Sequence, residues 1–184
     1  MKILGGTLKG QNFYMPAGIR PTQGLLRAAI FDLLGHDIEG LTFLELFAGS
    51  GAVGLEAISR GAKEVTMVER DPKNAETIRE NCRLLGIDLG AEHRLLEADV
   101  FATIKDMAAK ARTFDIVFFD PPFDRNMAKK TLKCLEAHVI LHAHSFLVAQ
   151  YDLSERIEVP GDMKIVTERR YGSSYLTIFQ KVTD

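Results

Sequence analysis

The chain has 184 residues, of which 46% are hydrophobic and 26% charged. This length and composition are typical of one globular domain with a sizeable core. No apolar run reaches about 18 residues, which excludes an ordinary membrane-spanning helix, and the first residues lack the apolar stretch of a signal peptide. The two cysteines, Cys82 and Cys134, stand far apart, which favours a reducing, cytoplasmic environment over a disulfide framework.

Charge is unevenly distributed along the chain, although the net charge is only −2. Residues 1–35 carry a net +3 and residues 163–184 a net +2, which leaves −7 for the middle of the chain. Basic ends on an acidic body can surround one opening with cations, as expected for a polyanionic partner. Chance clustering would explain the same small counts, so both interpretations stay open.

The first 40 residues differ in pattern from the rest. Residues 2–15 have glycines at turn positions and predict a β-hairpin. A helix is expected from near Thr22, whose hydroxyl can cap it, to Gly35. Its apolar positions form one stripe that is expected to pack in the core: Leu25, Leu26, Ala29, Ile30, Leu33 and Leu34. We expect a single domain over 1–184, with the hairpin extension at 1–20 and the core at 21–184.

From Leu41 onward, short apolar runs alternate with helical patterns. Such alternation predicts a parallel sheet covered by helices on both faces. The last two runs are both of strand type and predict an antiparallel pair at the end of the sheet. The expected strands are 42–47, 64–69, 93–99, 114–120, 145–151, 163–172 and 173–182, and the expected helices are 52–61, 71–86, 101–111 and 128–140.

A glycine loop, FAGSGAVG at 47–54, follows the first of these strands and opens a helix. It contains the G-x-G-x-x-G spacing, in which glycine lets the backbone turn tightly and approach a ligand. Glu69 ends the next strand about 20 residues on, where a carboxylate can accept hydrogen bonds from ribose hydroxyls. The pattern therefore predicts a nucleoside cofactor, either a nicotinamide dinucleotide or S-adenosylmethionine.

Two further acids favour S-adenosylmethionine. Glu45 precedes the loop, where its carboxylate could face the ammonium of a methionine moiety but would repel a pyrophosphate. Asp99 ends the third strand and could accept from the adenine amino group. Each acid could equally be a solvated residue at a strand end.

A second motif, FFDPPF at 118–123, ends a buried strand with an acid and two prolines. Proline cannot continue a central strand, so the chain must leave the sheet stiffly at this point. Asp120 and the Pro121 carbonyl could together accept both protons of an exocyclic amine and offset the charge that builds during methyl transfer. Phe123 offers a flat face on which the base can stack once it has left its own stack.

Four segments together resemble the RsmD-like family of bacterial small-subunit (16S) ribosomal RNA guanine-N2 methyltransferases. They are RPT at 20–22, LELFAGSGAVGLEAISRGA at 44–62, VERD at 68–71 and FDIVFFDPPF at 114–123. The resemblance implies a class I S-adenosylmethionine-dependent methyltransferase fold, which is Rossmann-like α/β, with a seven-stranded, mostly parallel sheet. It also implies an N-terminal hairpin that engages RNA. The chain departs from the family pattern at Ala28, where a glutamate is usual, and at Glu45, where an aspartate is usual.

The predicted function is methylation of the exocyclic N2 amine of a guanine in small-subunit ribosomal RNA, in the cytoplasm, by a monomer that binds RNA within the subunit or an assembly intermediate. The predicted catalytic residues are Asp120, Pro121, Pro122 and Phe123. The predicted cofactor-binding residues are Glu45, Phe47, Gly49, Ser50, Gly51, Glu69, Arg70, Asp99 and Val100. The predicted RNA-contacting residues are Lys2, Lys9, Arg20, Thr22, Arg169, Arg170 and Tyr171, with Arg20 and Thr22 alternatively on the cofactor.

Three other functions stay open. A DNA adenine-N6 methyltransferase also uses an Asp-Pro-Pro-aromatic motif, although this chain has no room for a target-recognition domain. A nucleotide-linked oxidoreductase fits the glycine loop alone. A non-catalytic RNA-binding or assembly factor is also open, since an enzyme that acts on ribosomal RNA must bind its particle. Cys134, His138 and His142 share a helical spacing that suggests a metal site, but a full ligand set is missing and no metal is expected.

Overall fold

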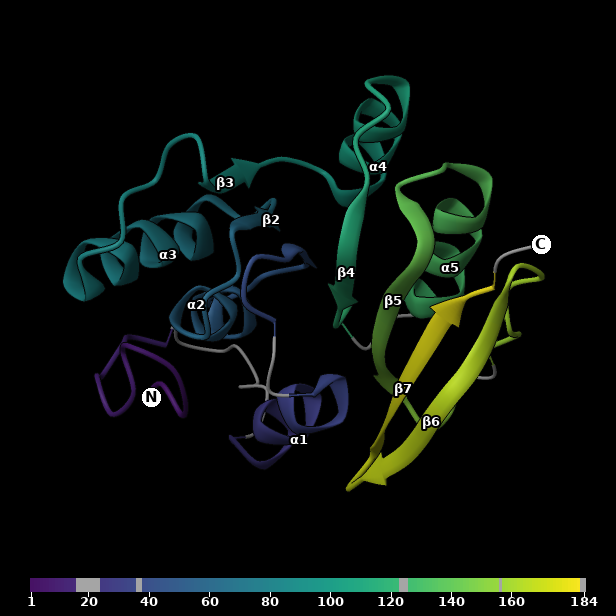
Figure 1. The fold of residues 1–184 in the computed structure, drawn as a ribbon, viewed down its shortest axis with the longest axis horizontal. Coiled ribbons are helices and arrows are strands. Elements are labelled where there is room, and N and C mark those ends of the chain that lie inside the picture. Colours follow the sequence, from purple (N-terminus) through teal and green to yellow (C-terminus); the bar gives the residue numbers. More distant parts are fainter. Residues whose placement is uncertain (16–23, 36–37, 123–125, 156, 183–184) are drawn as a thin grey trace.

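The computed structural model describes residues 1–15, 24–35, 38–122, 126–155 and 157–182. Within them, helices and strands alternate from the first strand to the fifth and then give way to two strands in succession (Figure 1). The strands are β1 Thr42–Leu46, β2 Glu64–Glu69, β3 His93–Glu97, β4 Phe114–Phe119, β5 Leu141–Asp152, β6 Met163–Tyr171 and β7 Ser174–Lys181. The helices are α1 Gly24–Leu34, α2 Ala52–Ser59, α3 Pro72–Leu85, α4 Val100–Ala109 and α5 Met127–Ala137.

All seven strands belong to one sheet with the order β3-β2-β1-β4-β5-β7-β6. β1 to β5 run parallel to one another, whereas β7 is antiparallel to both β5 and β6. This arrangement confirms the predicted mostly parallel sheet with an antiparallel end. The strand order reverses between β1 and β4, and ligands of open α/β sheets bind at the carboxyl ends of the strands at such a switch point.

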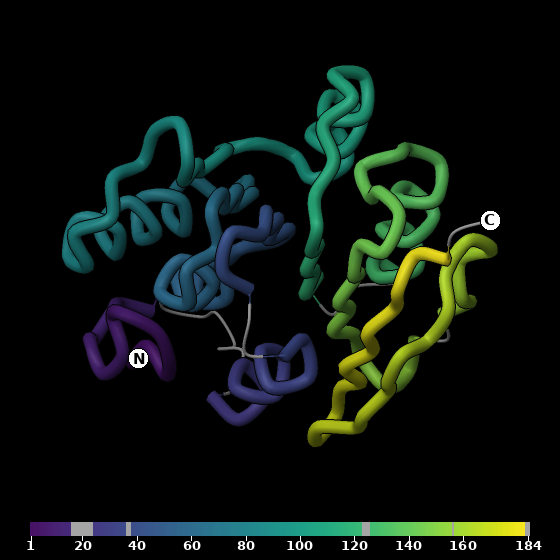
Figure 2. Tube along the Cα trace, viewed as in Figure 1, coloured from purple at the N-terminus to yellow at the C-terminus, as the bar shows by residue number. Residues whose placement is uncertain are grey.

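Helices cover both faces of the sheet, as the alternation predicted. On one face α1, α2 and α3 form a common core with the strands, in which Ile30, Leu55 and Ile78 belong to the same cluster as Phe43. On the other face Ile104 of α4 and Leu132 of α5 pack with Leu44 and Phe119. Figure 2 follows the chain from the purple N-terminal loop beside α2 to yellow β7, toward the opposite end of the sheet. No helix among the described residues is long and apolar enough to cross a membrane.

The N-terminal segment is less regular than the β-hairpin that the sequence predicted. Residues 1–15 double back, but their pairing is a single antiparallel bridge between Lys2 and Asn12 rather than two strands. The turn packs against the end of α2 instead: the Leu8 N–H donates to Ser59 Oγ at 2.9 Å. Gly6, at φ 75°, lies so close that a Cβ atom would stand 1.7 Å from the Ser59 carbonyl oxygen. Gly6 thus lets the turn pack closely against α2. The division at residue 20 lies outside the described residues.

Helix α1 packs most of its predicted stripe in the core. Leu26 and Ile30 are buried, and Ala29, Leu33 and Leu34 pack against the same cluster. Leu25 is the exception at 73% exposed, and Arg27 and Phe31 are fully buried although they were not predicted to be. Arg27 Nε lies 3.4 Å from Glu56 Oε2 of α2, and its guanidinium also stacks over the Phe13 ring. Burial lowers the pKa of Arg27, and the neighbouring Glu56 carboxylate works against that shift. Arg27 therefore joins α1, α2 and the N-terminal loop, and it does not contribute to a basic surface as the charge count assumed.

Candidate active site

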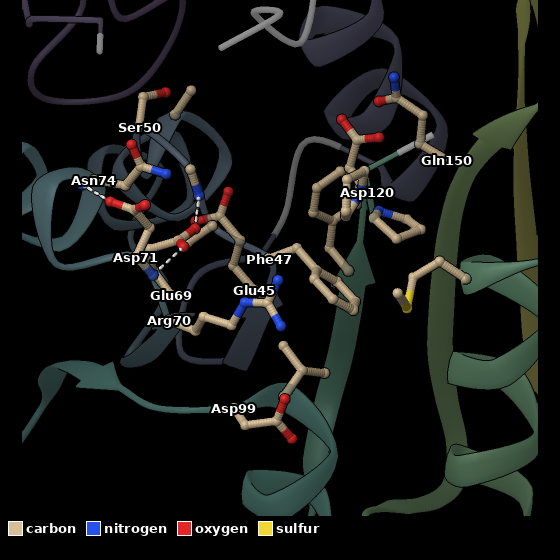
Figure 3. A pocket seen from close by; sticks show the side chains of 18 of the residues that line it. Glu45, Phe47, Ser50, Glu69, Arg70, Asp71, Asn74, Asp99, Asp120 and Gln150 are labelled. Atoms are coloured by element: carbon tan, nitrogen blue, oxygen red, sulfur yellow. Dashed lines mark hydrogen bonds between the residues drawn. The ribbon is translucent and has the colours of Figure 1, made fainter. Parts of the chain in front are cut away.

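A cavity of 460 Å³ lies at the carboxyl ends of β1, β2 and β4, where the switch point predicts a ligand site (Figure 3). It brings together most of the predicted cofactor-binding and catalytic residues. Those that line it are Glu45, Phe47, Gly49, Ser50, Glu69, Arg70, Asp99, Val100, Asp120, Pro121 and Pro122. Gly51 is not in the lining and acts at the start of α2. Phe123, Arg20 and Thr22 lie outside the described residues.

The glycine loop turns sharply between β1 and α2. Gly49 and Gly51 have φ angles of 57° and 73°, in the left-handed region that glycine adopts without strain. Phe47 has a φ of 58° although it is not glycine, and such strained residues concentrate at functional sites. Gly54 permits close packing, because a Cβ atom there would lie 2.7 Å from Glu45 Oε2 and from Met67 Cγ. The loop therefore needs glycine for its turn and for the approach of α2 to the sheet.

The side-chain carboxyl group of Glu45, a residue of β1, lies at the N-terminus of α2. Its two carboxylate oxygens accept hydrogen bonds from the N–H groups of Val53, at 3.2 Å, and Gly54, at 2.9 Å. The pKa of the Glu45 carboxyl is raised to about 8, mainly by burial and to a smaller extent by the nearby Glu69 and Asp120 carboxylates, against the opposing effect of the two N–H groups. In a dinucleotide-binding fold these helix N–H groups would hold the pyrophosphate. Here the Glu45 side chain already accepts hydrogen bonds from two of these N–H groups, so they are not available to a pyrophosphate.

Glu69 connects the loop to the end of β2. Its Oε2 accepts the Gly49 N–H at 2.7 Å and its Oε1 accepts the Asp71 N–H at 2.8 Å. Each carboxylate oxygen has a second lone pair, so both can still accept from a ligand hydroxyl. The side chain is fixed by the backbone on either side, which orients it for the ribose contact predicted from the sequence.

Two helices begin at the cavity with aspartate caps. Asp71 caps α3 by accepting from the N–H groups of Lys73 and Asn74, and Asp99 caps α4 by accepting from the Ala102 N–H at 3.0 Å. These caps explain why helices start there. Asp99 is exposed and lines the cavity while capping α4, so the structure gives it a structural contact beside the predicted ligand contact.

An apolar wall stands between these acids. The Phe47 and Phe101 rings meet edge to face with their centroids 6.5 Å apart, and Val100 lies beside them in the lining. Such a wall suits a flat heteroaromatic ring, with Asp99 at its border.

The DPP motif forms the opposite end of the cavity. Asp120 directly follows β4 and is half-buried, Pro121 is buried, and Pro122 is exposed. Gln150 of β5 and Met127 of α5 complete this end. Figure 3 shows Asp120 and Gln150 together, apart from Glu69, Asp71 and Asn74.

The charge of the lining is strongly one-sided. Five carboxyl groups line the cavity, whereas Arg70 is the single cation among its described residues. The carboxyl groups belong to Glu45, Glu69, Asp71, Asp99 and Asp120. Such a site favours a ligand with positive charge, such as an ammonium or a sulfonium, and disfavours a pyrophosphate.

The predicted RNA-contacting residues that the structure describes lie outside the cavity. Lys2 and Lys9 are exposed on the N-terminal loop, and Arg169 and Arg170 are exposed on the edge strand β6. Tyr171 is half-buried at the end of β6. In Figure 1 this loop and the β6–β7 turn stand on either side of α1, at the end of the sheet to which β4 points. The arrangement is compatible with two basic arms flanking one edge, and their contact with RNA stays a prediction.

The residues with metal-ligand spacing do not share one helix face. His138 follows the end of α5, with its Nδ1 3.9 Å from Cys134 Sγ, and His142 belongs to β5, where its Nε2 lies 3.0 Å from Asp115 Oδ1. Among the described residues, no group of three or more His, Cys, Asp or Glu side chains is arranged to hold a metal ion.

Sequence reasoning missed several lining residues. They are Ala48, Ala52, Asp71, Asn74, Phe101, Phe118, Met127 and Gln150. Asp71 and Phe101 could have been found, because each stands two residues after a predicted site acid. Gln150 could also have been predicted, because it is a polar residue near the carboxyl end of the apolar run SFLVAQY.

Known proteins are similar to this chain over most of its length. Ribosomal RNA small subunit methyltransferase D of Buchnera aphidicola is 31% identical over 86% of this chain and 81% of that protein, and its Escherichia coli namesake is 28% identical over 98% and 90%. A solved structure of a hypothetical protein from Thermus thermophilus is 31% identical, with a TM-score of 0.83 over 97% of this chain and 98% of that one. The family model described as Conserved hypothetical protein 95 matches residues 1–180. The chain therefore belongs to this family, the RsmD-like group that its motifs resemble, and has the class I S-adenosylmethionine-dependent methyltransferase fold.

Proposed function

We propose that the protein transfers a methyl group from S-adenosylmethionine to the exocyclic N2 amine of a guanine in small-subunit ribosomal RNA. One observation carries the proposal: a single cavity has the acidic, nucleoside-type lining at one end and the Asp120-Pro121-Pro122 backbone at the other. A methyl donor and an amine acceptor can therefore meet inside it.

The lining fits this cofactor. Glu69 would accept from the ribose hydroxyls, Asp99 from the adenine amine, and Glu45 would face the methionine ammonium. Phe47 and Phe101 would pack against the adenine ring. When bound, S-adenosylmethionine supplies a methyl group that is electrophilic because it is attached to a sulfonium. The five carboxyl groups of the lining suit its positive charges.

Asp120 would act on the acceptor. The lone pair of a guanine N2 is delocalised into the ring, so the amine is a poor nucleophile until its N–H groups are held out of the ring plane. The Asp120 carboxylate would accept one N–H and the Pro121 carbonyl the other, with the two prolines keeping both acceptors in place. The nitrogen then bonds to the methyl carbon, the carbon–sulfur bond breaks, and its electron pair goes to sulfur. The nitrogen loses one proton, which Asp120 can accept and pass to solvent.

Two alternatives are weakened by the geometry. An oxidoreductase needs space and donors for a pyrophosphate, yet Glu45 holds the N–H groups of Val53 and Gly54. A DNA adenine methyltransferase would share the DPP end of the cavity. The relatives described above are named for ribosomal RNA, which supports the RNA assignment.

The proposal is tested by offering four acceptors with radiolabelled S-adenosylmethionine. They are small ribosomal subunits that lack this modification, the naked RNA of those subunits, duplex DNA, and total protein. The labelled RNA or DNA is digested and the labelled nucleoside identified by chromatography. We expect label in N2-methylguanosine, with subunits or an assembly intermediate as the better acceptor. Label in N6-methyladenine of DNA would favour the alternative enzyme, and label in protein or in no acceptor would overturn the proposal.

A further inference from the structure

Gln150 is a polar side chain in the middle of the sheet. On β5 it stands between two buried residues, Ala149 and Tyr151, and it pairs in register with buried Leu176 of β7. Its own exposure is only 8%. An apolar side chain of similar size would pack at such a position without any polar atom to satisfy.

The carbonyl oxygen of Gln150 has no hydrogen-bond donor. Oε1 is buried, and no donor within the described chain lies within hydrogen-bond distance of it. Buried polar groups are almost always paired, and an unpaired one destabilises the folded state. An unpaired acceptor of this kind is expected at a ligand-binding site, because the ligand supplies the missing donor.

Gln150 and Asp120 stand at equivalent positions of neighbouring strands. β4 and β5 are parallel, and the last registered pair is Phe119 with Ala149. Asp120, the first residue after β4, and Gln150 of β5 each follow this pair, and both line the cavity (Figure 3). Cross-strand neighbours of a sheet point to the same side. The Gln150 carbonyl therefore belongs to the acceptor end of the cavity, beside the group proposed to hold the amine.

The neighbours of an exocyclic amine differ between bases. In guanine the ring atom beside the N2 amine on the Watson–Crick edge is N1, which carries a hydrogen and donates. In adenine and in cytosine the ring nitrogen beside the amine carries no hydrogen and accepts. An acceptor placed next to the amine site thus complements guanine and meets another acceptor in the other two bases.

We propose that Gln150 Oε1 accepts the N1–H of the target guanine beside the amine held at Asp120, and that this contact selects guanine. The inference rests on the proposed methyl transfer and adds to it the residue that distinguishes the base. Gln150 acts on the target base and not on the cofactor, whose predicted contacts lie at the other end of the cavity.

The test compares Gln150→Met, which keeps the bulk and removes the acceptor, with Gln150→Glu, which keeps an acceptor at that position. Gln180→Met is the matched control, because Gln180 lies on neighbouring β7 outside the cavity lining. Each protein is assayed for kcat and KM with unmodified small subunits, for S-adenosylhomocysteine affinity by calorimetry, and for Tm. Loss of one buried hydrogen bond to substrate predicts a fall of about 10- to 100-fold in kcat/KM for Gln150→Met.

The expected pattern separates recognition from folding. In Gln150→Met the S-adenosylhomocysteine affinity stays at the parent value and Tm stays equal or rises, because an unpaired acceptor has been removed. Gln150→Glu restores activity lost in Gln150→Met, and Gln180→Met resembles the parent. Parent-like kcat/KM in Gln150→Met, a parallel fall in Tm and activity, or a Gln150→Glu protein as inactive as Gln150→Met would each overturn the inference. If the parent protein itself forms no N2-methylguanosine, the proposed function fails, and this inference fails with it.

Discussion

The two ends of the cavity are built differently. At the cofactor end, Glu45, Glu69, Asp71 and Asp99 all accept hydrogen bonds from backbone N–H groups, so folding itself fixes them. At the acceptor end, two prolines fix the backbone after β4, while Gln150 Oε1 has no donor among the described residues. Under the proposed function, this difference means that the cofactor end is complete once the chain folds, whereas the acceptor end keeps hydrogen-bonding capacity for the base.

The largest effect is expected at the acceptor end. Asp120→Ala removes the group proposed to hold and charge-stabilise the amine, so the single-turnover rate of methyl transfer should fall by about 10³-fold. The rate is measured by rapid quench with saturating cofactor and unmodified small subunits. Asp106→Ala serves as the control, because Asp106 is an exposed residue of α4 outside the cavity lining. A rate within about threefold of the parent would remove Asp120 from the chemistry.

At the cofactor end, Glu69→Ala should affect binding and stability together. The Gly49 and Asp71 N–H groups would lose their acceptor, and the ribose would lose its partner. We expect S-adenosylhomocysteine affinity to fall by about 10- to 100-fold and the free energy of unfolding by about 1–3 kcal/mol. Calorimetric titration and urea unfolding measure the two. Glu97→Ala is the control, since Glu97 is paired in register with Glu69 on the neighbouring strand and lies outside the cavity lining. Unchanged cofactor affinity in Glu69→Ala would argue against the ribose contact.

Gly54→Ala tests the close packing of α2 on the sheet. The added Cβ would approach Glu45 Oε2 and Met67 Cγ to 2.7 Å, so the helix must shift away from β1. Overpacking of this kind destabilises by about 1–3 kcal/mol, and the displaced loop should also bind cofactor more weakly. Gly90→Ala is the matched control, because a Cβ there meets no atom within 4 Å. Equal urea midpoints for the two variants would show that the loop tolerates the displacement.

The smallest effect concerns the pH dependence of stability. Burial raises the pKa of Glu45 to about 8 from an ordinary 4.5, so the folded protein holds a proton there that the unfolded chain has lost. The free energy of unfolding should therefore fall as pH rises from about 4.5 to 8. Glu45→Gln cannot ionise at this position, so its free energy of unfolding should decline less between pH 5 and pH 8 than that of the parent. Parallel stability curves for the two proteins would show that Glu45 is ionised throughout.

Binding of a cationic cofactor should reverse this preference. An ammonium beside Glu45 favours the carboxylate, so S-adenosylmethionine should displace the Glu45 proton below pH 8. Titrations in two buffers of different ionisation enthalpy measure that proton directly. Equal apparent enthalpies in both buffers at pH 7 would place the ammonium elsewhere.

Local patterns predicted the sheet, the glycine loop and the DPP motif, because each depends on residues close together in sequence. β2 begins and ends at the predicted residues, and α3 lies between its Asp71 cap and Gly86, whose φ is 67°. Because a parallel sheet places the carboxyl ends of its strands at one edge, the predicted fold also brings Glu45, Glu69 and Asp120 to one cavity.

Features that depend on distant partners could not be predicted. Burial of Arg27 beside the α1 stripe requires Glu56 on another helix, and the spacing of apolar residues within α1 does not indicate that partner. The N-terminal segment looked like a hairpin, but its turn bonds to Ser59 of α2. The role of Gln150 depends on the register of β5 with β4 and β7, which no local pattern encodes.

The account rests on a cofactor end that is complete without RNA and separate from the acceptor end. The most direct measurement is calorimetric titration of S-adenosylhomocysteine into the parent protein and into Asp120→Ala, both free of RNA. The account predicts one bound ligand per chain with the same affinity in both proteins, although only the parent transfers methyl groups. Binding that requires RNA, or that is lost together with Asp120, would contradict it.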